Sequence, residues 1–156
     1  MIKRSLTWFI LLSLYVAGLM AQGVNTNATK DDWEEINFET SSAVLTDGYP
    51  SLLRLAELLT KNPGFKVRVE GHTDDKGVDA KNMDLSKRRA HSVAKWLTDN
   101  GIDLSRVEAY GCGENVPLDS NATDAGRQAN RRVEFHIIDP SPPNGVRSTD
   151  GCQLAQ

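Results

Sequence analysis

Four stretches of the sequence alternate between apolar and polar residues with the period of two that is typical of β-strands. They lie over residues 36–38, 65–72, 107–109 and 132–137. In each stretch one face is apolar and the other is polar. The alternation predicts a sheet with one face covered by other elements and one face in water. The charges on the second face are then explained as solvated sheet surface.

Two other segments have the spacing of amphipathic helices. Residues 50–59 place leucines on one stripe before a stop at 62–64, and residues 85–100 place four apolar side chains on one face. Asp84 or Ser86 could cap the start of the second helix, and Gly101 suits the position after its end. A loop or short helix is expected over residues 121–130. The order strand–helix–strand–helix–strand–strand predicts an α+β fold, a two-layer sandwich with two main helices on one face of a four-stranded mixed sheet.

The N-terminus is typical of an export signal. Lys3 and Arg4 precede an apolar run over residues 6–21 that ends in small residues. We expect cleavage near Ala21, while an uncleaved membrane anchor stays open because the run is at the lower edge of a bilayer span. Residues 22–32 are then a linker, 33–138 form one domain of normal size, and the proline-containing stretch 139–156 is an irregular tail.

Composition narrows the function classes. The chain has 156 residues and a formal net charge of −3, which becomes more negative without Lys3 and Arg4. This length disfavours a multi-domain enzyme, and the acidic balance disfavours a nucleic-acid binder. Cys112 and Cys152 both follow the export signal, where a disulfide is allowed, but the sequence does not fix whether they pair.

The chemistry-bearing residues gather after the second expected strand, in the turn over residues 71–77. His72 and Asp74 alone are too few for a metal site, which needs three or four ligands, so no metal is expected. The glycines around Cys112 lack the third glycine of a dinucleotide loop, and no cofactor is expected. The sequence carries no nucleophile elbow and no zinc-protease helix, so no catalytic residue is expected.

The chain resembles the OmpA-like peptidoglycan-binding domain family over residues 33–138. The resemblance rests on three groups of residues in this sequence. They are Gly71-His72-Thr73-Asp74 with Gly77, Asn82, Leu85-Ser86, Arg89-Ala90, Val93 and Leu97; Gly111-x-Gly113-Glu114 with Pro117; and Asn130-Arg131-Arg132-Val133-Glu134.

The resemblance implies non-covalent binding of the peptidoglycan stem peptide through its diaminopimelate residue. Asp74 and Arg89 would be the main ligand contacts, Thr73 and Asn82 would line the same pocket, and Arg131 would support them. Diaminopimelate ends in an ammonium and a carboxylate on one carbon. A carboxylate can accept from the ammonium, and a guanidinium can hold the carboxylate with two parallel bonds.

Structural alternatives exist for each of these residues. Judged alone, Asp74 would be a turn residue and Arg89 a surface ion-pair partner. Asn82 could equally close the loop by hydrogen bonds, and His72 is expected to be structural. Arg131 and its neighbour Arg132 are expected to divide between the pocket and the sheet face.

These expectations describe a non-catalytic protein of the periplasm or cell envelope of a Gram-negative-type bacterium, and association with the outer membrane stays open. Its partner is peptidoglycan, with membrane contact only if the N-terminal segment is uncleaved. The main alternative is an envelope scaffold that binds a protein through the charged sheet face. That face is formed by Lys66, Arg68, Glu70, Arg132, Glu134 and His136. The third hypothesis is a wall-cleaving enzyme. It would need a catalytic nucleophile or a metal site, and the sequence indicates neither.

Overall fold

The computed structural model describes residues 38, 42, 43, 45, 46, 48–140 and 151–155. The expected export signal, the linker and most of the first expected strand lie outside the described residues. Of that strand, Phe38 forms an isolated antiparallel bridge with Leu45. Within the described part of the chain, no helix is both long and apolar enough to cross a bilayer.

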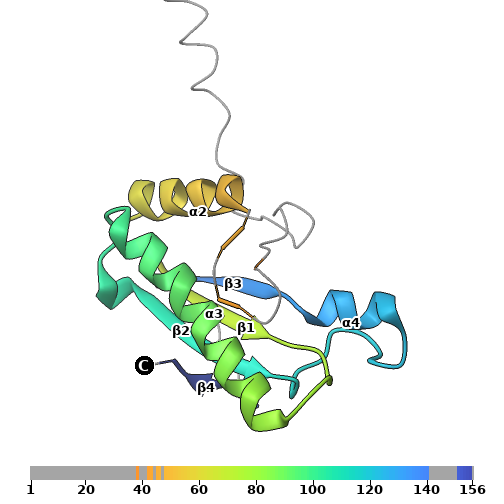
Figure 1. Ribbon diagram of the computed structural model, residues 1–156. Coiled ribbons are helices and arrows are strands. Elements are labelled where there is room, and N and C mark those ends of the chain that lie inside the picture. Colours follow the sequence, from red (N-terminus) through yellow and green to blue (C-terminus); the bar gives the residue numbers. More distant parts are fainter. Residues whose placement is uncertain (1–37, 39–41, 44, 47, 141–150, 156) are drawn as a thin grey trace, which may run out of the picture. The chain divides into compact units, whose positions relative to one another are not determined.

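The described elements follow the expected α+β order (Figure 1). They are α2 (Tyr49–Lys61), β1 (Lys66–His72), α3 (Asp79–Asp99), the 3₁₀ turn η2 (Leu104–Arg106), β2 (Val107–Gly113), α4 (Asp124–Asn130), β3 (Val133–Ile138) and β4 (Gln153–Leu154). The sheet order is β3-β1-β2-β4, with β1 parallel to β2 and the two outer pairs antiparallel. The predicted fold class, a four-stranded mixed sheet with helices packed on it, is confirmed.

The core lies between the helices and one face of the sheet. Leu52, Leu55 and Leu59 of α2 are fully buried against the inward side chains of β1 and against Val93 of α3. The apolar positions of β3 pack against the same cluster. The period of two in the strands and the helical stripes therefore meet in one core, as the sequence predicts.

Helix α3 begins earlier than predicted. Its first residue is Asp79 and its N-cap is Val78, which makes no side-chain cap hydrogen bond. Asp84 and Ser86 lie inside the helix, so the capping roles expected for them are wrong. The first turns are mostly polar, and their one buried side chain is that of Asn82, so they lack the apolar periodicity that marks a helix. The predicted end is confirmed, because α3 stops at Asp99 and Gly101 has a φ of 90°.

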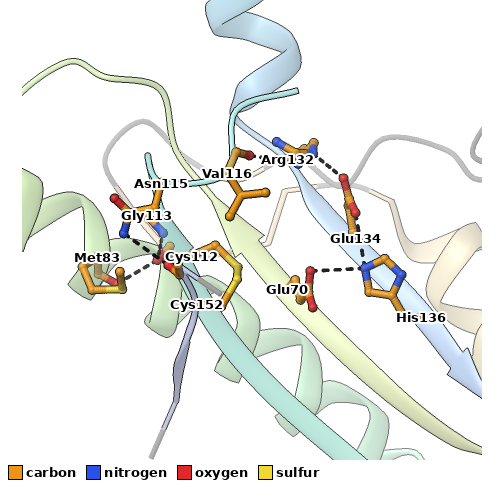
Figure 2. Close-up of a disulfide and its surroundings, with 12 residues drawn as sticks. Glu70, Met83, Cys112, Gly113, Asn115, Val116, Arg132, Glu134, His136 and Cys152 are labelled. Atoms are coloured by element: carbon orange, nitrogen blue, oxygen red, sulfur yellow. Dashed lines mark hydrogen bonds and ion pairs between the residues drawn. A yellow bond between two sulfur atoms is a disulfide. The ribbon is translucent and has the colours of Figure 1, made fainter. Parts of the chain in front are cut away.

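The C-terminal tail is predicted from the sequence to be irregular, but it contains a short strand. A disulfide joins Cys112, which is fully buried in β2, to Cys152 (Figure 2). The link brings Gln153 and Leu154 beside the edge of β2, where they pair as β4. This short strand supplies the fourth strand of the described sheet.

The second sheet face is not the solvated surface predicted from the alternation. Arg68 is 7% exposed and Glu70 is 2% exposed. The Arg68 guanidinium carbon lies 5.0 Å from the centre of the Tyr110 ring. Arg132 and Glu134 form an ion pair of 2.6 Å between side chains that are 10% and 18% exposed. Charged side chains on this face are therefore buried and paired.

Candidate ligand-binding site at the exit of strand β1

The site lies where the parallel strands β1 and β2 end. Parallel strands bring their C-terminal ends to the same edge of a sheet, so the loops that follow them meet. Thr73, directly after β1, donates its backbone N–H to Gly113 O at 2.8 Å. The loop over residues 73–78 is thereby fixed beside the end of β2.

Two glycines let α3 lie directly against this end of the sheet. A Cβ atom at Gly71 would be 2.3 Å from Ser86 O, and one at Gly111 would be 2.5 Å from Lys87 N. Any larger residue would push the helix away from the strands. The Ser86 hydroxyl also accepts from Gly113 N at 2.9 Å. This close packing brings Arg89, one turn further along α3, close to the loop after β1.

Asp74 is 8% exposed and its carboxylate is fully engaged. Its Oδ2 lies 2.5 Å from Arg131 Nη1, and its Oδ1 accepts from Lys76 N at 3.1 Å. The first contact links the β1 exit to the residue after α4, and the second closes a local turn. Asp74 is therefore oriented by partners on two elements.

Arg89 is also 8% exposed, which is unusual for a helix arginine. Its Nε donates to Ser42 O at 3.1 Å, and its guanidinium carbon lies 5.0 Å from the centre of the Phe38 ring. Among the described residues, its two terminal nitrogens have no hydrogen-bond partner. Burial and the nearby charge of Arg131 lower the pKa of Arg89, whereas Asp74 raises it. The group stays a cation at neutral pH, held in place with its terminal nitrogens available.

Asn82 closes the loop. It is 7% exposed, and its Nδ2 lies 3.2 Å from Asp74 O, 3.1 Å from Lys76 O and 2.7 Å from Glu114 Oε2. These bonds connect the first turn of α3 to both loops. Of the two roles considered for Asn82, the structure contains the loop-closing hydrogen bonds.

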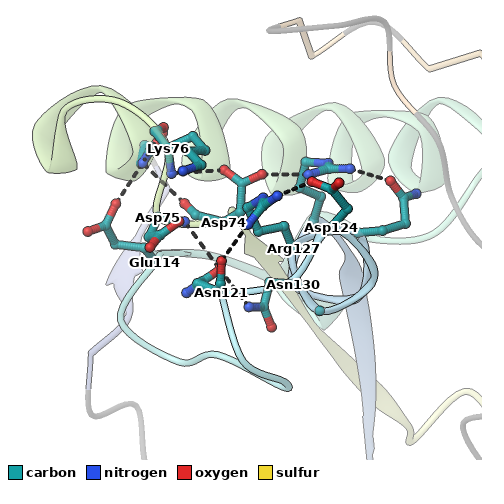
Figure 3. Close-up of polar contacts among 12 residues, drawn as sticks. Asp74, Asp75, Lys76, Glu114, Asn121, Asp124, Arg127 and Asn130 are labelled. Carbon is teal, nitrogen blue, oxygen red and sulfur yellow. Dashed lines mark hydrogen bonds and ion pairs between the residues drawn. The ribbon is translucent and has the colours of Figure 1, made fainter.

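Asn130 holds the β2–α4 loop beside the site. In the sequence it belongs to one of the family motifs, but no role was assigned to it. It is fully buried. Its Oδ1 accepts from the backbone N–H groups of Leu118 and Asp119, and its Nδ2 donates to Asp119 O and to Asn121 Oδ1. Asn121 Oδ1 also accepts from Asp75 N at 3.4 Å, so the β2–α4 loop is connected to the β1 exit (Figure 3).

Two buried side chains at the end of β1 lack partners. Thr73 Oγ1 and both ring nitrogens of His72 make no hydrogen bond with any described residue. Burial, together with the charge of Arg132, lowers the pKa of His72 to about 4. A hydrogen bond from His136, with Arg132 beside it, holds the pKa of the Glu134 carboxyl well below its usual range. His72 is therefore neutral at pH 7.

The structure thus gathers the expected residues Thr73, Asp74, Asn82, Arg89 and Arg131 at one end of the molecule. Sequence reasoning gave no roles to Ser42, Glu114 and Asn121, which contact them. Glu114 and Asn121 could have been found from the sequence, because both follow β2, the strand that runs parallel to β1 and ends at the same edge of the sheet. No periodic pattern marks Ser42.

The chain is similar to known proteins over most of its described length. The family model described as the OmpA family matches residues 37–131. Outer membrane porin F of Pseudomonas fluorescens is 45% identical over 96 residues, which are 62% of this chain and 29% of that protein. The chain therefore spans less than a third of that relative. Outer-membrane lipoprotein YfiB of Pseudomonas aeruginosa is 37% identical over 131 residues, 78% of this chain and 75% of that protein.

One solved structure of similar fold is the cell wall anchor of the T6SS from Pseudomonas aeruginosa. It superposes with a TM-score of 0.58 and is 36% identical, covering 65% of this chain and 73% of that one.

Proposed function

Because the chain belongs to the OmpA family, we propose that it binds cell-wall peptidoglycan without cleaving it, as an exported protein of the Gram-negative envelope. Two of its relatives are outer-membrane proteins, and a structural relative is a cell wall anchor. Their names support both the location and the ligand. In this proposal residues 1–21 direct export, whether or not they are cleaved.

The proposed ligand group is the diaminopimelate of the stem peptide. Its side chain ends in a zwitterion, so a site for it needs one cation and one anion a few ångströms apart. Arg89 and Asp74 supply these two charges, because each is 8% exposed and the Asp74 carboxylate is near enough to raise the pKa of Arg89. A zwitterion would satisfy both charges at once.

The observation that supports the proposal most is the burial of Arg89 without a carboxylate partner among the described residues. A buried guanidinium normally has a carboxylate partner, since an unpaired charge is costly to bury. Here Arg89 Nε donates to Ser42 O, and the guanidinium lies against the Phe38 ring. The terminal nitrogens have no hydrogen-bond partner among the described residues. These nitrogens have the fork geometry that holds a carboxylate with two parallel bonds.

The surrounding residues have supporting roles in this proposal. Arg131 holds the Asp74 carboxylate until the ammonium of the ligand shares it. Asn82 keeps the loop closed, and Thr73 offers a buried hydroxyl without a partner among the described residues. Each charge-assisted contact contributes about 1.5–3 kcal/mol, so affinity for one stem peptide is modest. Retention on the wall then comes from the many copies that a polymer presents.

The scaffold alternative loses support from the burial of the sheet face. Arg68 and Glu70 are buried, and Arg132, Glu134 and His136 pair with neighbours on the same face. Little of this charge is offered to a protein partner. No described observation favours that reading.

Co-sedimentation with isolated sacculi tests the proposal. We expect the full chain to pellet with diaminopimelate-type sacculi and to stay in the supernatant with lysine-type sacculi. Arg89→Ala should weaken binding by about tenfold or more, because the lost contact is charge-assisted.

The matched control is Arg88→Ala. Arg88 is the neighbouring residue on α3, its side chain is 54% exposed, and it pairs only with Asp84 among the described residues. The control should pellet like the wild type. A folded Arg89→Ala variant that still pellets normally would overturn the site, and a wild type that never pellets would overturn the function.

A further inference from the structure

Four ionisable side chains meet on the sheet face that points away from α3. Glu70 and His72 alternate along β1, and Glu134 and His136 alternate along β3. The antiparallel register places Glu70 directly opposite Glu134. Residues two apart on a strand point to the same face, so the four side chains share one patch. None of them belongs to the proposed peptidoglycan site.

The distances within this cluster leave room for an ion between three of its side chains. One carboxylate oxygen of Glu70, one of Glu134 and one ring nitrogen of His72 all lie within 4.8 Å of one another. Ligand atoms bound to one tetrahedral zinc ion at about 2.0–2.1 Å are themselves about 3.3 Å apart, so small side-chain movements would bring these three atoms to one ion. His136 Nε2 lies 3.3 Å from Glu70 Oε2 and 3.3 Å from Glu134 Oε2 and pairs with both carboxylates (Figure 2).

His72 supplies the imidazole of this group. It is fully buried, and neither of its ring nitrogens has a hydrogen-bond partner among the described residues. One of these nitrogens lies within 4.8 Å of carboxylate oxygens of both Glu70 and Glu134. A buried polar group without a partner needs an explanation, and an ion beside it is one.

We propose that Glu70, His72 and Glu134 bind one divalent transition-metal ion, with zinc as the probe and water completing the coordination. One neutral imidazole and two carboxylates form a three-ligand set whose two negative charges balance the ion. Arg132 Nε holds Glu134 Oε1 at 2.6 Å, which leaves Oε2 directed at the cluster. The positive charge of Arg132 opposes the cation and keeps the affinity moderate.

The nearby cysteines are not ligands. Cys112 and Cys152 also have sulfur atoms within 4.8 Å of a Glu70 oxygen, but they are joined in a disulfide and offer no thiolate. The sequence predicts no metal site, because ligands close together along the chain are too few. Glu70 and Glu134 are far apart in sequence, and only the β1–β3 pairing brings them together.

The test is zinc binding by the full chain, purified without a histidine tag and stripped with a chelator. Calorimetry should find one zinc ion per chain, and X-ray absorption should find nitrogen and oxygen neighbours at about 2.0 Å with the scattering of one imidazole. His72→Gln should weaken binding by about tenfold or more. His91→Gln is the matched control, because His91 is exposed on α3, and it should bind like the wild type.

Three outcomes would overturn the proposal. They are no stoichiometric zinc binding, binding that His72→Gln leaves unchanged (an adventitious ion only), and an absorption spectrum without imidazole scattering. Glu134→Gln provides a second variant if His72→Gln fails to fold, and the absorption spectrum needs no variant. Sacculus binding is measured separately, so this proposal can fail while the proposed function stands.

Discussion

Arg131 Nη1 lies 2.5 Å from Asp74 Oδ2, and this ion pair joins the loop after β1 to the residue that follows α4. The two residues are far apart in sequence, so the pair depends on the whole fold. Asp74 is mostly buried and Arg131 is partly exposed, which makes Arg131 the partner that can move. A ligand ammonium could share Asp74 without unfolding the loop.

Replacing Arg131 should affect binding more than stability. In Arg131→Gln we expect the free energy of unfolding to change by less than about 1 kcal/mol, because partly exposed ion pairs contribute little. Affinity for sacculi should fall about three- to tenfold, since Asp74 loses the group that orients it. Urea unfolding and quantitative co-sedimentation measure the two effects. A binding loss as large as that of Asp74→Asn would instead make Arg131 a main ligand contact.

Asn130 should contribute strongly to the stability of the fold, because its buried side chain makes four hydrogen bonds. Asn130→Ala removes four hydrogen bonds and leaves the N–H groups of Leu118 and Asp119 without their acceptor. We expect a loss of about 3 kcal/mol in urea unfolding. The control is Asn115→Ala. Asn115 is exposed and its side chain donates one hydrogen bond to Gly151 O, so the change should cost less than about 1 kcal/mol. Equal losses in the two variants would contradict this assignment.

His72 should make the metal-free protein less stable in mild acid. Burial and Arg132 lower its pKa to about 4, while Glu134 and Glu70 oppose this shift and His136 adds to it. Between pH 6.5 and 4 the unfolded chain binds a proton that the folded chain does not. Stability should therefore fall by up to about 3 kcal/mol as the pH drops through this window, and no further through His72 below it.

The measurement is urea unfolding of chelator-treated protein across this pH range, with NMR of the His72 ring. The ring signal should titrate near pH 4. Titration of that signal near 6.5 would mean that His72 is not buried as the structure has it.

The disulfide should stabilise the fold without forming part of the ligand site. It closes a loop with a sequence separation of 40 residues, for which the chain-entropy model gives about 4 kcal/mol. Cys152→Ser with Cys112→Ala should lower the free energy of unfolding by about that amount and release β4 from β2. Sacculus binding by the folded variant should be unchanged, because Asp74 and Arg89 do not contact β4. Lost binding in a folded double variant would contradict this separation.

Much of the fold follows from short-range patterns. The period of two located the core strands, and the leucine stripe located α2 within two residues at each end. The start of α3 was missed because its first turns have no apolar face and no side-chain cap. The pairing of residues 153–154 with β2 was missed because a two-residue strand has no periodicity, and its position depends on the disulfide.

The site could be predicted from the sequence less well than the fold. The residues Asp74 and Arg89 came from a family resemblance, since a turn aspartate and a helix arginine carry no signal of their own. The burial of the charged sheet face could not be predicted, because alternation distinguishes the two faces but does not show whether charged side chains cover one another. The contact of Ser42 with Arg89 depends on a segment without periodic structure.

The central claim is that Arg89 recognises the carboxylate of diaminopimelate, and paired calorimetric titrations test it most directly. One ligand is a soluble stem peptide ending in diaminopimelate, and the other has lysine in its place, which keeps the ammonium and lacks that carboxylate. The wild type should bind the first about 10- to 100-fold more tightly, and Arg89→Ala should bind both equally weakly. Equal affinity of the wild type for the two peptides, or an undiminished preference in folded Arg89→Ala, would contradict the account.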